Sequence, residues 1–170
     1  WYPGAGIYRN VWLTKINPVH VAQWGTFIRA KGVSSSSATV DLDVYVENKS
    51  RIDQNIRIVT EVFKLNNLGK KEKQVASFPV TDNITHAGKK LKFENSVTIK
   101  SPSLWGPSPS QTPNLYVAVT RLYASGKIID EYETQFGIRS LQFDPVKGLL
   151  LNGKPVRMQG VNQHHDLGAL

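Results

Sequence analysis

The sequence predicts an all-β protein built as an antiparallel β-sandwich. Three observations support this. β-Branched and aromatic residues alternate with polar ones along several short runs, turn-forming clusters separate the runs at intervals of roughly ten residues, and no stretch between them has helical periodicity. Each run has one apolar and one polar face, as expected when two sheets bury only the sides that face each other.

The first predicted strands follow one another closely. Residues 39–47 alternate most cleanly, with Val or Leu at every second position of one face. After a turn at residues 48–50 the pattern resumes at 55–63, and after a second turn at 66–70 it returns at 73–80. These three runs are expected to be consecutive strands joined by short connections.

The second half of the chain repeats the pattern with one long interruption. A polar loop at residues 82–88 precedes an alternating run at 90–99, and a proline-rich crossing occupies residues 101–113. Two further strands are expected at 115–123 and 128–137. The number and spacing of these strands are typical of an immunoglobulin-like β-sandwich.

The two ends of the chain differ from the middle. Residues 1–20 are rich in aromatic residues and contain the apolar run Val11-Trp12-Leu13, which is expected to form a strand. Near the other end, Asn152-Gly153 separates two apolar runs and predicts a hairpin, because both central residues of a type I′ turn need positive φ. A chain that opens without an initiator Met favours a piece of a larger protein.

Composition excludes several classes of function. The net charge is +8, but the basic residues are scattered, and the clusters at 70–73 and 89–92 adjoin predicted turns, where lysine keeps sheet edges soluble. This favours solvated edges over a nucleic-acid partner. The absence of cysteine excludes disulfides and Cys-ligated metals, and no apolar run approaches the roughly 18 residues of a membrane span. The compartment stays open, and a periplasmic or otherwise exported bacterial parent is compatible with the sequence.

Four stretches carry a resemblance to a known family. They are Trp-Tyr-Pro-Gly-Ala-Gly-Ile-Tyr-Arg-Asn-Val-Trp-Leu at 1–13, Leu-Trp-Gly-Pro at 104–107 with Pro-Asn-Leu-Tyr at 113–116, Phe-Gly-Ile-Arg at 136–139, and Leu-Asn-Gly-Lys-Pro-Val at 151–156 followed by Gly-Val-Asn and His-His-Asp. In this order and spacing they resemble glycoside hydrolase family 2, the family of β-galactosidases, β-glucuronidases and β-mannosidases. The ending from His164 to Leu170 is most similar to the β-galactosidase members.

The resemblance implies three segments. Residues 1–20 would end an N-terminal, sugar-binding jelly-roll domain, and residues 21–142 would form the immunoglobulin-like domain. Residues 143–170 would supply the hairpin and first strand that lead into a (β/α)8 catalytic barrel. The implied partners are therefore the jelly-roll and barrel domains of the same chain, together with a β-glycoside substrate.

The resemblance also implies where catalysis resides. Retaining glycosidases use two carboxylates about 5–5.5 Å apart, and in the family both are glutamates on later barrel strands, beyond residue 170. The glutamates present here lie at polar strand positions or turns and are expected to be solvated: Glu47, Glu61, Glu72, Glu94, Glu131 and Glu133. We therefore expect no catalytic residue, no cofactor and no hydrolysis by this chain alone.

His164, His165 and Asp166 form the one polar cluster with the composition of a site. One reading is that they are merely exposed. A metal site is disfavoured, because adjacent strand residues point to opposite faces. The resemblance implies a third reading, in which Asp166 contacts the sugar in the catalytic subsite of the intact enzyme and His164 lines the same pocket, with His165 between them. Such residues would sit at the C-terminal mouth of the barrel.

The tryptophans and the remaining histidines have simpler expectations. Trp12, Trp24 and Trp105 lie in or beside apolar contexts, which favours core or interdomain packing over the sugar stacking seen in carbohydrate-binding modules. His20 and His86 are isolated in the sequence and are expected at the surface or in turns.

Three functions follow from these patterns. The first is a structural module that links a jelly-roll to a catalytic barrel and sets their relative position. The second is a free-standing carbohydrate-binding or adhesive module, because immunoglobulin-like folds serve many unrelated uses. The third, a competent hydrolase, is disfavoured because the two catalytic glutamates are missing.

Overall fold

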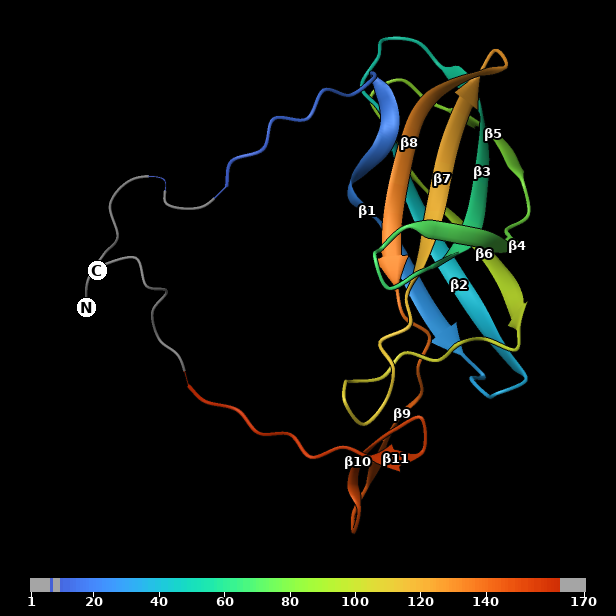
Figure 1. Cartoon of the computed structure of the whole chain (residues 1–170). Coiled ribbons are helices and arrows are strands. Elements are labelled where there is room, and N and C mark those ends of the chain that lie inside the picture. The colour runs from blue at the N-terminus through green and yellow to red at the C-terminus, as the bar shows by residue number, and fades with distance from the viewer. Residues whose placement is uncertain (1–6, 8–9, 163–170) are drawn as a thin grey trace.

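The computed structural model describes residue 7 and residues 10–162, and within this part it contains strands and no helix. Figure 1 shows two sheets packed face to face, with a small third sheet at one end. One sheet has the order β1-β2-β6, and the other has the order β4-β3-β7-β8 with β5 also paired to β3. Their bounds are β1 Val19–Lys31, β2 Ser37–Asn48, β3 Gln54–Leu65, β4 Lys71–Ser77, β5 Thr81–Thr85, β6 Lys90–Lys100, β7 Tyr116–Ala124 and β8 Lys127–Phe136.

The third sheet lies after the sandwich in sequence. It consists of β9 Leu141–Asp144, β10 Gly148–Leu151 and β11 Lys154–Pro155, in the order β11-β10-β9. The turn between β10 and β11 is the predicted one, since Asn152 and Gly153 have φ values of 54° and 75°. The hairpin signal is therefore confirmed.

The core lies between the two large sheets and is built by strict alternation. On β2, Val40 and Val46 are fully buried and Leu42 and Val44 are almost so, while Thr39, Asp41 and Tyr45 on the other face are only partly buried. Ile58 and Val62 of β3 complete the same layer from the facing sheet. Full burial of one such side chain contributes about 1.5–3 kcal/mol relative to exposure, so this layer dominates the stability of the fold.

Tyr116 marks the sandwich as immunoglobulin-like. It is the first residue of β7, is 2% exposed, and accepts a hydrogen bond on its hydroxyl from the Ser103 backbone N–H at 2.7 Å. A buried tyrosine that begins this strand and bonds back to the preceding connection is a hallmark of immunoglobulin-like sandwiches. The predicted fold class is confirmed.

Most predicted strands are present, and three expectations about strands are wrong. The polar residues 81–85 form β5 instead of a loop, because pairing with the N-terminal part of β3, residues 54–58, compensates for their low strand propensity. Residues 78–80, expected in a strand, lie outside β4. The run Val11-Trp12-Leu13 is not a strand, because no neighbouring strand in the described part of the chain pairs with it.

β1 was missed by the sequence pattern because its alternation is interrupted. Its register with β2 shifts between Val21 and Thr26, and this bulge breaks the period of two. The expectation for Trp12 and Trp24 is core or interdomain packing. They are 81% and 85% exposed and so do not pack in this core, and interdomain packing stays a prediction. The surface or turn position expected for His20 is wrong. It is the second residue of β1 and is buried, with Nδ1 2.8 Å from the Asn17 carbonyl oxygen and Nε2 3.7 Å from Glu47 Oε2.

Candidate functional site

Several specific side-chain hydrogen bonds gather at the junction between the sandwich and the small sheet. There the proline-rich crossing that connects β6 to β7 approaches the β9–β11 sheet, as Figure 1 shows below the two large sheets. Three segments meet: the crossing around Trp105, the strand exit at Ile138–Ser140 and the hairpin at Asn152. We call these three segments the Asn152 junction.

The side chain of Asn152 connects all three segments. Its Nδ2 donates to the Trp105 carbonyl oxygen at 2.8 Å and to Gln111 Oε1 at 2.9 Å. Its Oδ1 accepts from the Ser140 backbone N–H at 3.0 Å, and its own N–H donates to the Ser140 carbonyl oxygen at 3.0 Å. Both amide hydrogens are therefore used, and the left-handed backbone that asparagine tolerates turns the chain at the same point.

Gln111 adds a second link between the crossing and the hairpin. Its Nε2 donates to the Leu151 carbonyl oxygen at 3.1 Å, while its Oε1 receives the bond from Asn152. Gly106 packs closely against the side chain of Gln111. A Cβ added at Gly106 would lie 2.5 Å from both Gln111 Cβ and Gln111 Oε1. A glycine is thus needed for the amide of Gln111 to reach the hairpin.

Trp105 joins the crossing to the end of β8. Its N–H donates to the Ile138 carbonyl oxygen at 2.8 Å, and the Arg139 guanidinium carbon lies 4.8 Å from the centroid of its ring. Gly137 packs against the indole so closely that a Cβ at that position would lie 2.7 Å from Trp105 Cβ. The half-buried Trp105 therefore has a packing role inside the chain, as expected, and two of the sequence motifs touch each other.

The glutamates do not form a hydrolytic pair. Glu61 and Glu131 both bind Arg121, with Nη1 2.7 Å from Glu61 Oε2 and Nε 2.6 Å from Glu131 Oε2. Hydrogen bonds from Glu131 and Glu61 raise the pKa of Arg121, so the guanidinium stays charged between the two carboxylates. A general acid needs a carboxyl group that keeps its proton, and a permanent cation between two carboxylates disfavours that state.

The other glutamates are also accounted for by charge pairing or exposure. Glu47 lies within 3.5 Å of both Lys49 and Lys90, Glu94 binds Lys92, and Glu133 binds Lys71. Glu72 is exposed on β4. In the described part of the chain, no cluster of three His, Asp or Glu side chains has the geometry of a metal site.

One open groove lies on the outer face of the larger sheet. It has a volume of about 940 Å³ and is lined by Asn55, Arg57, Asp82, Ile84 and Tyr123, among others. Arg57 and Asp82 form a two-bond pair at 2.8 and 3.0 Å, and this pairing lowers the pKa of Asp82. Small-molecule sites in proteins combine aromatic or apolar side chains with a few polar groups, and the lining of this groove has both.

The predicted substrate contacts cannot be placed in this geometry. His164, His165 and Asp166 lie outside the described residues, so their role stays a prediction. The described residues include no helix with the length and hydropathy to cross a membrane.

Comparison with known proteins assigns the fold to a family. The model of "Glycosyl hydrolases family 2" matches residues 19–139, from the first residue of β1 to just past β8. The chain belongs to glycosyl hydrolase family 2. The resemblance drawn from the four sequence stretches is therefore confirmed.

Relatives of this family 2 chain are bacterial glycosidases. It is 36% identical over 170 residues to the β-galactosidase BoGH2A of Bacteroides ovatus, covering all of this chain and 19% of the relative. A solved β-glycosidase from Bacteroides vulgatus matches with 32% identity and a TM-score of 0.74, covering 95% of this chain and 19% of that one. The β-glucuronidase 2 of Bacteroides uniformis matches with 27% identity and a TM-score of 0.79 over 95% of this chain and 19% of that one.

The family 2 chain spans about a fifth of the length of these relatives. It is thus a domain-sized part of the longer architecture that the relatives have.

The sequence pattern indicates Asn152 only as a turn former and gives no sign of its side-chain contacts with Trp105 and Gln111. The local turn preference already explains an asparagine at this position, so nothing in the sequence indicates partners 41 and 47 positions away.

Proposed function

We propose that this chain is the non-catalytic immunoglobulin-like domain of a β-galactosidase-type retaining glycoside hydrolase. Its role is to hold an N-terminal jelly-roll domain and a (β/α)8 catalytic barrel in a fixed relative position. The parent enzyme hydrolyses terminal β-glycosides, and β-galactosides are the first substrates to test. The 36% identity to a β-galactosidase supports this choice, whereas relatives named as β-glucuronidases or putative β-glucuronidases are 28–30% identical.

The Asn152 junction is the observation that carries the proposal. Its hydrogen bonds join the hairpin after the sandwich to the crossing within it, so residues 148–155 move with the sandwich. A following domain would then begin at a fixed place and in a fixed direction. Catalysis needs reacting groups held to within a fraction of an ångström, so a rigid exit from the linking domain is functionally useful.

The chemistry of the parent lies in other segments under this proposal. Asp166 contacts the sugar in the catalytic subsite, His164 lines the same pocket with His165 beside it, and the two catalytic glutamates come from the barrel. In the sandwich, Glu61 and Glu131 are engaged with Arg121 and offer no acid and nucleophile pair. The isolated chain is therefore expected to be inactive.

Two assays test the proposal. The full-length protein that contains this chain should hydrolyse nitrophenyl β-D-galactopyranoside, and faster than the corresponding glucuronide. The 170-residue chain alone should release no nitrophenol under the same conditions. Turnover by the isolated chain would contradict the structural role, and a full-length protein inactive on both substrates would contradict the assignment of the parent.

A free-standing carbohydrate-binding module is the second candidate, and the groove beside Tyr123 favours it. Arg57, Asp82 and Asn55 supply polar groups next to the aromatic ring. Calorimetric titration of the chain with galactose and lactose distinguishes the two functions. Binding heat that the wild-type chain gives and Tyr123→Ala does not would support the carbohydrate-binding module. Zero heat with the wild-type chain would support the linking role.

A further inference from the structure

Trp24 is held outside the core in an unfavourable backbone conformation. It is 85% exposed, has a φ of 55°, and lies in the bulge where the register of β1 and β2 shifts. The left-handed region is disfavoured for a bulky L-residue. The next residue, Gly25, is required there, since a Cβ would lie 2.5 Å from the Ala22 carbonyl oxygen. Packing within the sandwich explains neither the residue nor its conformation.

The bulge is fixed on both sides by contacts with β8. The Val21 N–H donates to Asp130 Oδ2 at 2.7 Å, and the hydroxyls of Thr26 and Thr134 lie 2.6 Å apart. The bulge is therefore pinned immediately before and after its irregular residues. A side chain that is presented rigidly loses little further freedom on binding, which is the property of an interface anchor.

The surface beside the bulge has the composition of a protein interface. Phe27 is 55% exposed on the same strand, and the Arg29 guanidinium carbon lies 5.1 Å above the centroid of its ring. Trp, Phe and Arg are enriched at protein–protein contacts and are frequent among the residues that dominate their energy. Trp24 does not line the groove beside Tyr123, so it belongs to a separate surface.

The segment before β1 indicates what covers Trp24. Val11, Trp12 and Leu13 are 74%, 81% and 100% exposed and have no regular secondary structure. The segment is tied to the sandwich at Asn17, whose side-chain amide donates to the Ile129 carbonyl oxygen.

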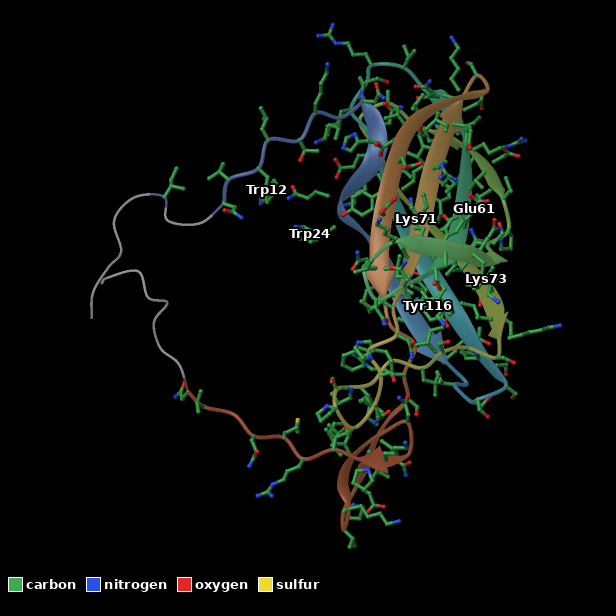
Figure 2. The ribbon with its side chains drawn as sticks, in the orientation of Figure 1. Trp12, Trp24, Glu61, Lys71, Lys73 and Tyr116 are labelled. Carbon is green, nitrogen blue, oxygen red and sulfur yellow. The ribbon has the colours of Figure 1, made fainter. Side chains whose placement is uncertain are left out.

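Trp12 lies five positions before Asn17, a reach of at most about 17 Å. Figure 2 shows Trp12 and Trp24 on the same side of the sandwich, the side along which this segment runs. A partner domain that buries the apolar run at 11–13 therefore lies on the side of the sandwich that carries the β1 bulge.

We propose that Trp24 anchors the sandwich to the domain that precedes it in the longer polypeptide, by inserting into an apolar pocket of that domain. This inference rests on the proposed function, in which residues 1–20 complete that preceding domain. The same domain buries Val11 and Trp12, so one partner covers both exposed tryptophans. The strained bulge keeps the indole directed toward that partner even when the partner is absent.

Hydroxyl-radical footprinting with mass spectrometry tests the proposal, because it reads the solvent access of individual side chains. The full-length protein and the 170-residue chain are labelled in parallel. Trp24 and Trp12 should be oxidised several-fold less in the full-length protein, while Leu68, 80% exposed on the turn between β3 and β4, should react equally in both. Equal labelling of Trp24 in the two proteins would overturn the proposal. Protection of Trp24 that appears only after oligosaccharide is added would overturn it in favour of a sugar contact.

A variant of Trp24 distinguishes a side chain that holds the preceding domain in place from one that only lies near it. Trp24→Asn keeps a residue that tolerates positive φ and removes the indole. In the full-length protein it should raise the labelling of Trp12, and Leu68→Asn, the matched control, should not. Unchanged Trp12 labelling in Trp24→Asn would overturn the anchoring role. The proposed function fails separately, by inactivity of the full-length protein toward both nitrophenyl glycosides.

Discussion

The side-chain amide of Asn152 donates to the carbonyl oxygen of Trp105 across 47 residues of sequence, at 2.8 Å. This bond joins the hairpin that leaves the sandwich to the crossing that lies within it. Because Trp105 is also bonded to Ile138 at the end of β8, the contact ties the exit of the domain to its last core strand. Several measurable consequences follow from this arrangement.

Removing the Asn152 side chain should destabilise the chain without breaking the turn. Asn152→Gly keeps a residue that adopts a φ of 54° at no steric cost but loses the bonds to Trp105, Gln111 and Ser140. We expect a loss of about 1–3 kcal/mol, since half-buried partners are left unsatisfied. Urea denaturation of the 170-residue chain measures this. Gly153→Asn, which keeps positive φ at the neighbouring turn position, should change stability less. An unchanged urea midpoint in Asn152→Gly would contradict the role given to the junction.

Gly137→Ala should be destabilising for a steric reason. The new methyl group would meet Trp105 Cβ at 2.7 Å, so the indole or the backbone has to move, at a cost of about 1–3 kcal/mol. Gly160→Ala is the matched control, because nothing lies within 4 Å of a Cβ at that position. Thermal unfolding followed by circular dichroism compares the two variants. Equal melting temperatures would show that the contact between Gly137 and Trp105 is not tight.

Asp43 should be the most important carboxylate for stability. It is 4% exposed on β2, accepts two hydrogen bonds from Arg29 at 3.0 and 3.2 Å, and lies 3.1 Å from the Lys92 ammonium. Both cations are partly exposed and can be rehydrated, so Asp43→Ala is expected to cost about 1–3 kcal/mol. Asp41→Ala, at a more exposed position of the same strand, should cost less. Urea denaturation should give a lower midpoint for Asp43→Ala than for Asp41→Ala. The reverse order would refute the greater role given to Asp43.

Stability should fall in acid below the ordinary carboxyl range. A hydrogen bond from Lys49, with Lys90 nearby, holds the pKa of Glu47 below its usual value, and the Ala87 N–H and His86 do the same for Asp53. Since the folded-state pKa is the lower one, these carboxylates stabilise the fold above their unfolded values near about 4. That contribution is lost as the pH falls through the folded-state values. Unfolding curves at pH 3 to 7 test this, and Glu47→Gln should flatten the dependence. A stability that rises toward pH 3 would be contrary to expectation.

The fold could be predicted from sequence where the pattern is local. Alternation identified β2 and β6 because their apolar residues keep strict register against the facing sheet. It failed for β1, where the Val21–Thr26 shift moves the apolar positions, and for β5, whose polar residues pair only because β3 offers an edge. Propensity describes a residue alone, whereas these two strands depend on their neighbours.

The candidate site was predictable only in part for the same reason. The motifs at Leu104–Pro107 and Phe136–Arg139 were recognisable, yet their mutual contact through Trp105 and Gly137 appears only in three dimensions. The exposure of Trp24 was not foreseen, because an aromatic residue in an apolar stretch resembles a core residue until the bulge is known.

The most direct test of the account is the activity of the full-length enzyme carrying Asn152→Gly. The kcat/KM for nitrophenyl β-D-galactopyranoside should be measured at a temperature where circular dichroism shows the variant folded, with Leu68→Asn as the control. Under the proposed function we expect a clear fall in kcat/KM in Asn152→Gly alone, because the sandwich would no longer fix the direction of the chain toward the proposed catalytic barrel. Wild-type kcat/KM in the folded Asn152→Gly enzyme would contradict the claim that this domain positions the active site.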